Sequence, residues 1–146
     1  MKKIIFYFLI FAFKPNAAAQ CSLPLHFTGN TGSNMTVMFT PDVVEAFPDN
    51  LLEDAYVVSV ANNSGLVVGS QSVYGLMQFS LAVWGDDSST PENDGAAANE
   101  SLTYYLVNGD ELYDIEVTTF SGPSSLYQTY QTAAISILHA INVTFN

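Results

Sequence analysis

The chain has 146 residues, enough for one domain and not comfortably for two. Its only basic residues besides histidine are Lys2, Lys3 and Lys14. Residues 20–146 therefore contain 14 acidic residues and no Lys or Arg, which gives them a formal charge of −14. Nucleic acids are bound chiefly by cations that neutralise phosphates, so nucleic acid is excluded as a partner. The same deficit nearly excludes anionic membrane surfaces.

Residues 1–19 are predicted to be a secretory signal peptide. Two lysines at the start precede an apolar run, Ile4 to Phe13, and Ala17-Ala18-Ala19 supplies small residues for cleavage before Gln20. A ten-residue run is too short to cross a bilayer, which takes about twenty residues. We therefore expect a secreted or cell-surface protein whose mature chain, residues 20–146, has no transmembrane segment.

Cys21 is the only cysteine, so it cannot form a disulfide within the chain. Because it follows the signal directly, a lipoprotein with an acylated Cys21 is the alternative. Gln20 argues against that alternative, since the processing favours a small residue before the cysteine. Pairing of Cys21 with another chain stays open, and so does the oligomeric state.

Short runs in which apolar and polar residues alternate predict strands along most of the chain. Pro41 begins a helix that Pro48 ends within two turns. Asn108-Gly109 is the strongest turn signal and predicts a hairpin. The predicted strands cover residues 34–40, 55–61, 66–69, 72–84, 101–107, 112–118 and 135–145. About seven strands and almost no helix predict one all-β domain over 20–146, an antiparallel β-sandwich of Ig-like or jelly-roll-like type, with a β-barrel as the alternative.

The segment from Trp84 to Gly95 holds the only tryptophan and four carboxylates. These four, Asp86, Asp87, Glu92 and Asp94, are the candidate metal ligands, because calcium takes six to eight oxygens and needs no regular structure to supply them. Calcium is therefore the one candidate cofactor. The alternative is a solvated turn in which the acids bond to nearby backbone groups. We favour the turn.

No catalytic motif accompanies these acids, so we do not expect an enzyme. The only histidines are His26, in an irregular entry, and His139, in the apolar register of the last predicted strand. A glycoside hydrolase needs a carboxylate pair, for which Asp86, Asp87, Glu92, Asp94 and Glu100 are available. Most of these lie in one loop and not on rigid strands, so a hydrolase is the third choice.

Three motifs mark a resemblance to a known group of proteins. They are the run Phe79 to Asp87 with its Trp-Gly-Asp-Asp end, the loop Thr90-Pro91-Glu92-Asn93-Asp94-Gly95, and the hairpin that leads to Leu112-Tyr113-Asp114. Over residues 30–117 they resemble an uncharacterised module of secreted and surface proteins of marine Bacteroidetes. The resemblance implies adhesion or surface assembly. Such proteins often carry a C-terminal sorting domain for type IX export, which this chain does not show, so its export route stays open.

We therefore expect a non-catalytic binding or adhesion module that recognises a glycan or a surface protein. Aromatic side chains near polar groups are typical of glycan sites, and Trp84, Tyr74 and Tyr105 are the candidates. The alternative function is a purely structural module of a surface layer or fibre.

Overall fold

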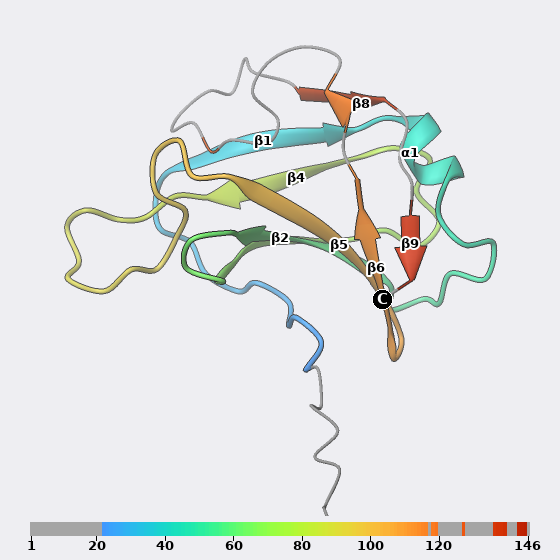
Figure 1. Ribbon diagram of the computed structural model, residues 1–146, viewed down its shortest axis with the longest axis horizontal. Coiled ribbons are helices and arrows are strands. Elements are labelled where there is room, and N and C mark those ends of the chain that lie inside the picture. The colour runs from blue at the N-terminus through green and yellow to red at the C-terminus, as the bar shows by residue number, and fades with distance from the viewer. Residues whose placement is uncertain (1–21, 117, 120–126, 128–135, 140–142, 146) are drawn as a thin grey trace, which may run out of the picture.

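Figure 1 shows the computed structural model, which describes residues 22–116, 118–119, 127, 136–139 and 143–145. Its strands form two sheets, with strand orders β4-β1-β8-β7 and β3-β2-β5-β6-β9. The predicted all-β fold is confirmed. The elements are β1 Asn34–Phe39, α1 Pro41–Glu45, β2 Tyr56–Ala61, β3 Val67–Ser72, β4 Phe79–Trp84, β5 Leu102–Asn108, β6 Glu111–Ile115, β7 Thr118–Thr119, β8 Ser136–His139 and β9 Val143–Phe145.

The predicted signal peptide and Cys21 lie outside the described residues. Among the residues that are described, the one helix is α1, which has five residues. No helix in this part of the chain combines the length and the apolarity that a membrane span requires.

Strand β1 pairs along its whole length with β4, and the two strands form half of the first sheet. The pairing is antiparallel and runs from Asn34 opposite Trp84 to Phe39 opposite Phe79. Inward residues alternate with half-buried or exposed ones in both strands, as the sequence predicts. Strand β8 pairs with the other side of β1 in parallel. The predicted strand at 34–40 is therefore confirmed, whereas the one at 72–84 is a strand only in its second half.

The second sheet is antiparallel throughout the described strands. Strands β2 and β3 form the predicted hairpin around residues 62–65, and β2 pairs with β5 from Tyr56 opposite Val107 to Ala61 opposite Leu102. The side chains of Leu102, Tyr104 and Leu106 in β5 are buried in the core. Its pairing with β6 confirms the second predicted hairpin.

The turn of that second hairpin lies one residue later than Asn108-Gly109. Asn108 pairs with Glu111, so the turn consists of Gly109 and Asp110. Gly109 has a φ of 62°, as the first central residue of a type II′ turn requires. The prediction that Asn108 is a turn residue was wrong. Asn108 is buried, and its side-chain oxygen accepts a 2.8 Å hydrogen bond from the backbone N–H of Leu52.

The single strand predicted over residues 135–145 was also wrong. Strand β8 belongs to the first sheet and pairs with β1, whereas β9 is the end strand of the second sheet and pairs with β6. Alternation shows which residues share a face, and it carries no information on which sheet supplies the backbone partners. Residues 140–142 and the side chain of His139 lie outside what the structure describes.

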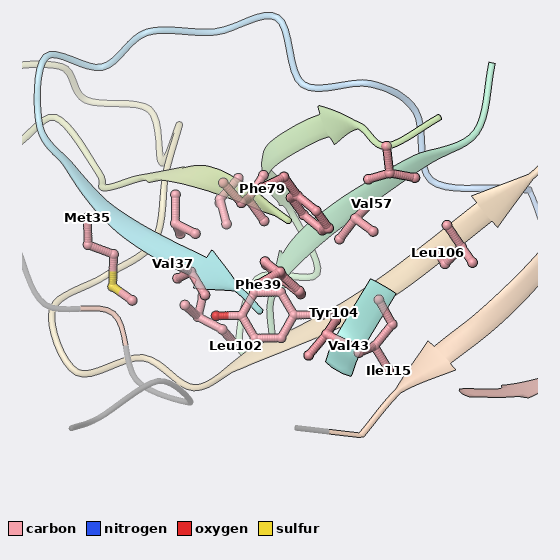
Figure 2. Packing of buried hydrophobic residues seen from close by; sticks show 14 of the residues in the cluster. Met35, Val37, Phe39, Val43, Val57, Phe79, Leu102, Tyr104, Leu106 and Ile115 are labelled. Atoms are coloured by element: carbon pink, nitrogen blue, oxygen red, sulfur yellow. The ribbon is translucent and has the colours of Figure 1, made fainter. Parts of the chain in front are cut away.

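Side chains from both sheets form one hydrophobic core (Figure 2). Phe39 of the first sheet stacks on Phe79, with ring centroids 4.4 Å apart, and meets the ring of Tyr104 edge-on at 5.6 Å. Tyr104 belongs to the second sheet, so this contact joins the two sheets. Burial raises the pKa of the Tyr104 phenol. Val43, from α1, is fully buried in the same core.

Strands β3 and β4 are the end strands of different sheets and lie against each other. Gly69 in β3 faces the backbone carbonyl of Ala82 in β4, and a Cβ at position 69 would overlap the carbonyl oxygen. A glycine is needed where two backbones approach this closely. The two sheets therefore meet through backbone atoms along this side.

The entry segment, residues 22–33, begins by lying against β2 and β3. The Tyr56 hydroxyl donates to the carbonyl of Pro24 at 2.8 Å, and the backbone N–H of Phe27 donates to the Ser70 hydroxyl at 2.9 Å. The His26 ring stacks on Tyr56 with centroids 3.7 Å apart. Burial and then the charge of Asp54 raise the pKa of Tyr56. These contacts lead the entry segment toward the end of the molecule where β1 begins.

Candidate functional site

The acidic loop, residues 85–95, leaves the end of β4 and returns beside it. The backbone N–H of Ala96 donates to the carbonyl of Trp84 at 2.9 Å, and that of Asp86 donates to the carbonyl of Ala96 at 2.9 Å. Gly85 and Ala96 form a parallel bridge. The loop, yellow in Figure 1, projects from one end of the sheets with its base closed by these bonds.

Two of the four predicted metal ligands hold the loop together through its backbone. Oδ1 of Asp86 accepts the backbone N–H of Asp94 at 3.1 Å, and Oδ1 of Asp94 accepts the backbone N–H of Asp87 at 3.1 Å. The two bonds are nearly reciprocal, so they fix both sides of the loop. Local bonds from Asp to backbone are what the solvated-turn alternative predicts.

Asp87 organises the tip of the loop. Its Oδ1 accepts the backbone N–H of Ser89 at 2.9 Å, and its carbonyl accepts both the backbone N–H and the hydroxyl of Thr90, at 3.0 and 2.9 Å. Hydrogen bonds from the hydroxyl and the backbone of Ser89 lower the pKa of the Asp87 carboxyl. Glu92 is exposed, and its carbonyl accepts the Thr90 hydroxyl at 3.2 Å.

Within the described residues, no group of three or more His, Cys, Asp or Glu side chains is arranged to hold a metal ion. The loop therefore gathers its acids along one stretch of chain without focusing them on one point. The bonds of Asp86 and Asp94 to backbone N–H groups account for their placement.

Two glycines make the base of the loop narrow. A Cβ at Gly95 would overlap the backbone of Gly85, and a Cβ at Gly85 would overlap the phenol of Tyr127. Tyr127 is buried, with 1% of its surface exposed, and its hydroxyl has no hydrogen-bond partner in the described part of the chain. The Tyr127 ring thus forms a packed floor beneath the start of the loop.

Glu100 joins the segment that follows the acidic loop to the β2–β3 turn. It is 3% exposed, and its Oε1 accepts the backbone N–H groups of Asn63 and Ser64 at 2.8 and 3.2 Å. Its Oε2 accepts the backbone N–H of Ala97 at 2.8 Å. The Glu100 carbonyl also accepts the backbone N–H of Tyr127 at 2.8 Å. The sequence offered Glu100 as one carboxylate of a hydrolase pair, whereas here it satisfies three backbone donors.

A cleft of about 490 Å³ lies between the acidic loop and the end of the entry segment. Its two walls are bonded together, because the Thr31 hydroxyl donates to the carbonyl of Gly85 and the backbone N–H of Gly85 donates to the carbonyl of Ser33 at 2.9 Å. We call this space the loop cleft. Its lining residues are Thr31, Gly32, Ser33, Asp86, Asp87, Ser88, Ala96, Ala97 and Ala98.

The three aromatic candidates do not lie together. Trp84 is half-buried at the end of β4, and Tyr74, 52% exposed, precedes the start of the same strand. The six residues of β4 alone separate its start from Trp84 by about 17 Å. Tyr105 lies in β5 of the other sheet on the side away from the core, where burial and the charge of Asp114 raise its pKa. None of the three lines the loop cleft.

Comparison with protein-family models, curated proteins and solved structures gives no match. The loop cleft and the charge around it are therefore the features of the molecule that bear on its function. The sequence pointed to one wall of this cleft, the acidic loop, through its carboxylates. It did not point to the other wall, residues 31–33 of the entry segment. Thr31 and Ser33 carry no distinctive motif, and only the fold brings them to Gly85, which lies 54 positions beyond Thr31.

Proposed function

We propose that the chain is a secreted or cell-surface module that binds a glycan in the loop cleft without catalysing a reaction on it. We also propose that residues 20–146 form an antiparallel β-sandwich of Ig-like or jelly-roll-like type, which two sheets with a shared core support. The apolar start of the chain supports export. The resemblance of the acidic loop to modules of marine Bacteroidetes supports a role at the cell surface.

The observation that carries this proposal is the chemistry of the loop cleft. Its volume of about 490 Å³ lies within the range of small-molecule sites, about 300–1,000 Å³. Hydroxyl and carboxylate side chains line it beside three alanines. Carboxylates accept hydrogen bonds and hydroxyls both accept and donate them, which matches the many hydroxyls of a sugar.

Charge narrows the class of glycan. Asp86 and Asp87 line the cleft, and no Lys or Arg follows Lys14 in the sequence. A sulfated or uronic-acid polysaccharide would meet like charge there with no cation to offset it. The ligand is therefore a neutral sugar or one that bears amino groups.

A glycan array tests this proposal when it is probed with the mature chain and with an Ala98→Trp variant. Ala98 is exposed and lines the cleft, so a large side chain at this position fills the space from its rim. We expect wild-type binding to neutral or amino sugars and a loss of affinity of at least about tenfold in the variant. Tyr74→Ala, before the start of β4 and outside the cleft lining, is the matched control and should bind as the wild type does.

Three outcomes would contradict the proposal. Binding that Ala98→Trp leaves unchanged would place the ligand elsewhere, and binding confined to anionic glycans would overturn the charge argument. Release of free sugar from a bound oligosaccharide, measured by chromatography and abolished by Asp86→Asn, would make the protein a glycoside hydrolase. A melting curve for each variant confirms that the fold is kept.

The second candidate function is a structural module of a surface layer or fibre. The separation of Trp84, Tyr74 and Tyr105 favours it, because a structural module needs no aromatic platform. An array on which the folded wild-type protein binds no glycan, together with regular assemblies of the pure protein in electron micrographs, would support this candidate over the first.

A further inference from the structure

Four large apolar side chains project into solvent at the end of the molecule opposite the acidic loop. They lie in the two segments that precede β2 and β4, and we call them the apolar tip. Their exposed fractions are 48% for Leu52, 52% for Tyr74, 39% for Leu76 and 78% for Met77. Single exposed apolar residues are ordinary, whereas several in two segments that are hydrogen-bonded to each other are typical of an interaction site.

Backbone hydrogen bonds hold the two segments of the apolar tip together. The N–H of Ala55 donates to the carbonyl of Leu52 at 3.0 Å, and the N–H of Val73 donates to the carbonyl of Ala55 at 3.0 Å. The N–H of Leu76 then donates to the carbonyl of Val73 at 3.2 Å. This chain of bonds fixes the backbone of the tip, so little backbone conformational entropy is lost when a partner binds.

Buried anchors fix the Leu52 side of the tip. The backbone N–H of Leu52 is bonded to the buried side chain of Asn108 at 2.8 Å. A Cβ at Gly109 would lie 2.8 Å from Cδ1 of Leu52, so the β5–β6 turn packs directly beside this side chain. Asp110, in that turn, is exposed.

The surroundings of the apolar tip are acidic. Glu53 and Asp54 follow Leu52, Asp110 lies in the neighbouring turn, and all three are exposed. No Lys or Arg occurs after Lys14 to neutralise them. A second copy of the chain, also at −14, would bring like charge to this surface. Anionic lipid would do the same.

We propose that the apolar tip docks a partner protein through a surface segment that combines apolar side chains with Lys or Arg. The partner's apolar side chains pack around Tyr74, Leu76 and Met77. Its Lys or Arg side chains pair with the surrounding carboxylates, Glu53, Asp54 and Asp110. An apolar centre with a charged rim is the usual anatomy of a protein interface. The flexible side chain of Met77 adapts to different apolar shapes. This interface is separate from the loop cleft, so it stands or falls independently of glycan binding.

Selection of a phage-displayed random peptide library on the immobilised mature chain tests the proposal. We expect the enriched peptides to combine Leu, Phe or Trp with Lys or Arg. Synthetic versions should lose at least about tenfold in affinity for the double variant Leu76→Ser/Met77→Ser. Their affinity should also weaken as salt rises from about 50 mM to about 500 mM, because the rim charges are exposed. Glu92→Gln, in the acidic loop, is the control and should bind normally.

The proposal is overturned if no peptides are enriched, if the enriched peptides lack cations, or if they bind the double variant as tightly as the wild type. It is also overturned if sedimentation shows a wild-type dimer that the double variant lacks, since the occupant would then be a second copy. Both substitutions are at exposed positions, so the melting temperature should not change. Met77→Ser alone, at the most exposed of the four positions, gives the same test if the double variant folds poorly.

Discussion

The carboxylate of Glu100 accepts the backbone N–H of Asn63 at 2.8 Å, across 37 positions of the chain. Because two further backbone donors depend on the same buried group, Glu100→Gln should lower the free energy of unfolding by about 2 kcal/mol. The amide retains one acceptor oxygen and turns an NH2 group toward the remaining donors. Urea unfolding measures the change. Glu92→Gln, at an exposed acid in the acidic loop, should stay within about 0.5 kcal/mol of wild type, and equal midpoints for the two variants would refute the assignment.

Gly85→Ala should be destabilising by about 1–3 kcal/mol, because the added methyl group overlaps the Tyr127 phenol. Tyr127→Phe removes the nearest atom and also a buried hydroxyl that has no hydrogen-bond partner among the described residues, so by itself it should be neutral or stabilising. The double variant should therefore lose less stability than Gly85→Ala does. A double-mutant cycle of unfolding free energies gives this coupling, and strict additivity would show that the two residues do not touch.

Phe39→Ala should lower the free energy of unfolding by about 3–5 kcal/mol. Phe39 is fully buried and its ring contacts both Phe79 and Tyr104, so its loss opens a cavity between the sheets. Leu25→Ala is the matched control, because that side chain is 77% exposed and should change stability by no more than about 0.5 kcal/mol. Similar losses for both would mean that the core lies elsewhere.

The stability that Asp87 contributes should disappear in acid. Its carboxyl pKa in the folded protein lies below the ordinary value of about 3.9, because the hydroxyl and backbone N–H of Ser89 bond to the charged form. Since the folded pKa is the lower one, the contribution is fully present above the unfolded value and is lost as the pH falls through the folded value. The difference in melting temperature between wild type and Asp87→Asn should therefore shrink from about pH 6 to about pH 2. A difference that grows in acid would contradict the assignment.

Removal of calcium should leave the melting temperature unchanged at low salt. Asp86 and Asp94 already accept backbone N–H groups, and these bonds hold the loop without an ion. The test compares the melting temperature measured with EDTA with the melting temperature measured with added CaCl2. A higher melting temperature in calcium that Asp86→Asn abolishes would show that the loop is a calcium site.

Local patterns predicted the elements that depend on local information. Met35, Val37 and Phe39 alternate, and the strand they define is buried on that face. The role of Glu100 could not be found in the same way, because it follows from Ala61 lying opposite Leu102 in a pairing between distant strands. That register places the residues just beyond β2 against those just before β5.

The same limit applies to the candidate site. The sequence located the acids of the loop, since Asp, Asn, Pro and Gly mark an irregular segment wherever it folds. It could not show that Asp86 and Asp94 bond to backbone N–H groups, because this depends on the path of the loop. Nor could it separate Tyr74 from Trp84, since both were chosen for their residue type alone.

The contact between Gly69 and Ala82 has a consequence for how the protein behaves when it is concentrated. An uncovered outer strand offers a row of free N–H and C=O groups, and neighbouring molecules join there to form aggregates. Here the carbonyl of Ala82 in β4 faces Gly69 of β3, so β3 covers part of the outer side of β4. The fold protects part of this outer strand without the edge lysines that many β proteins use, residues that this chain lacks after position 14.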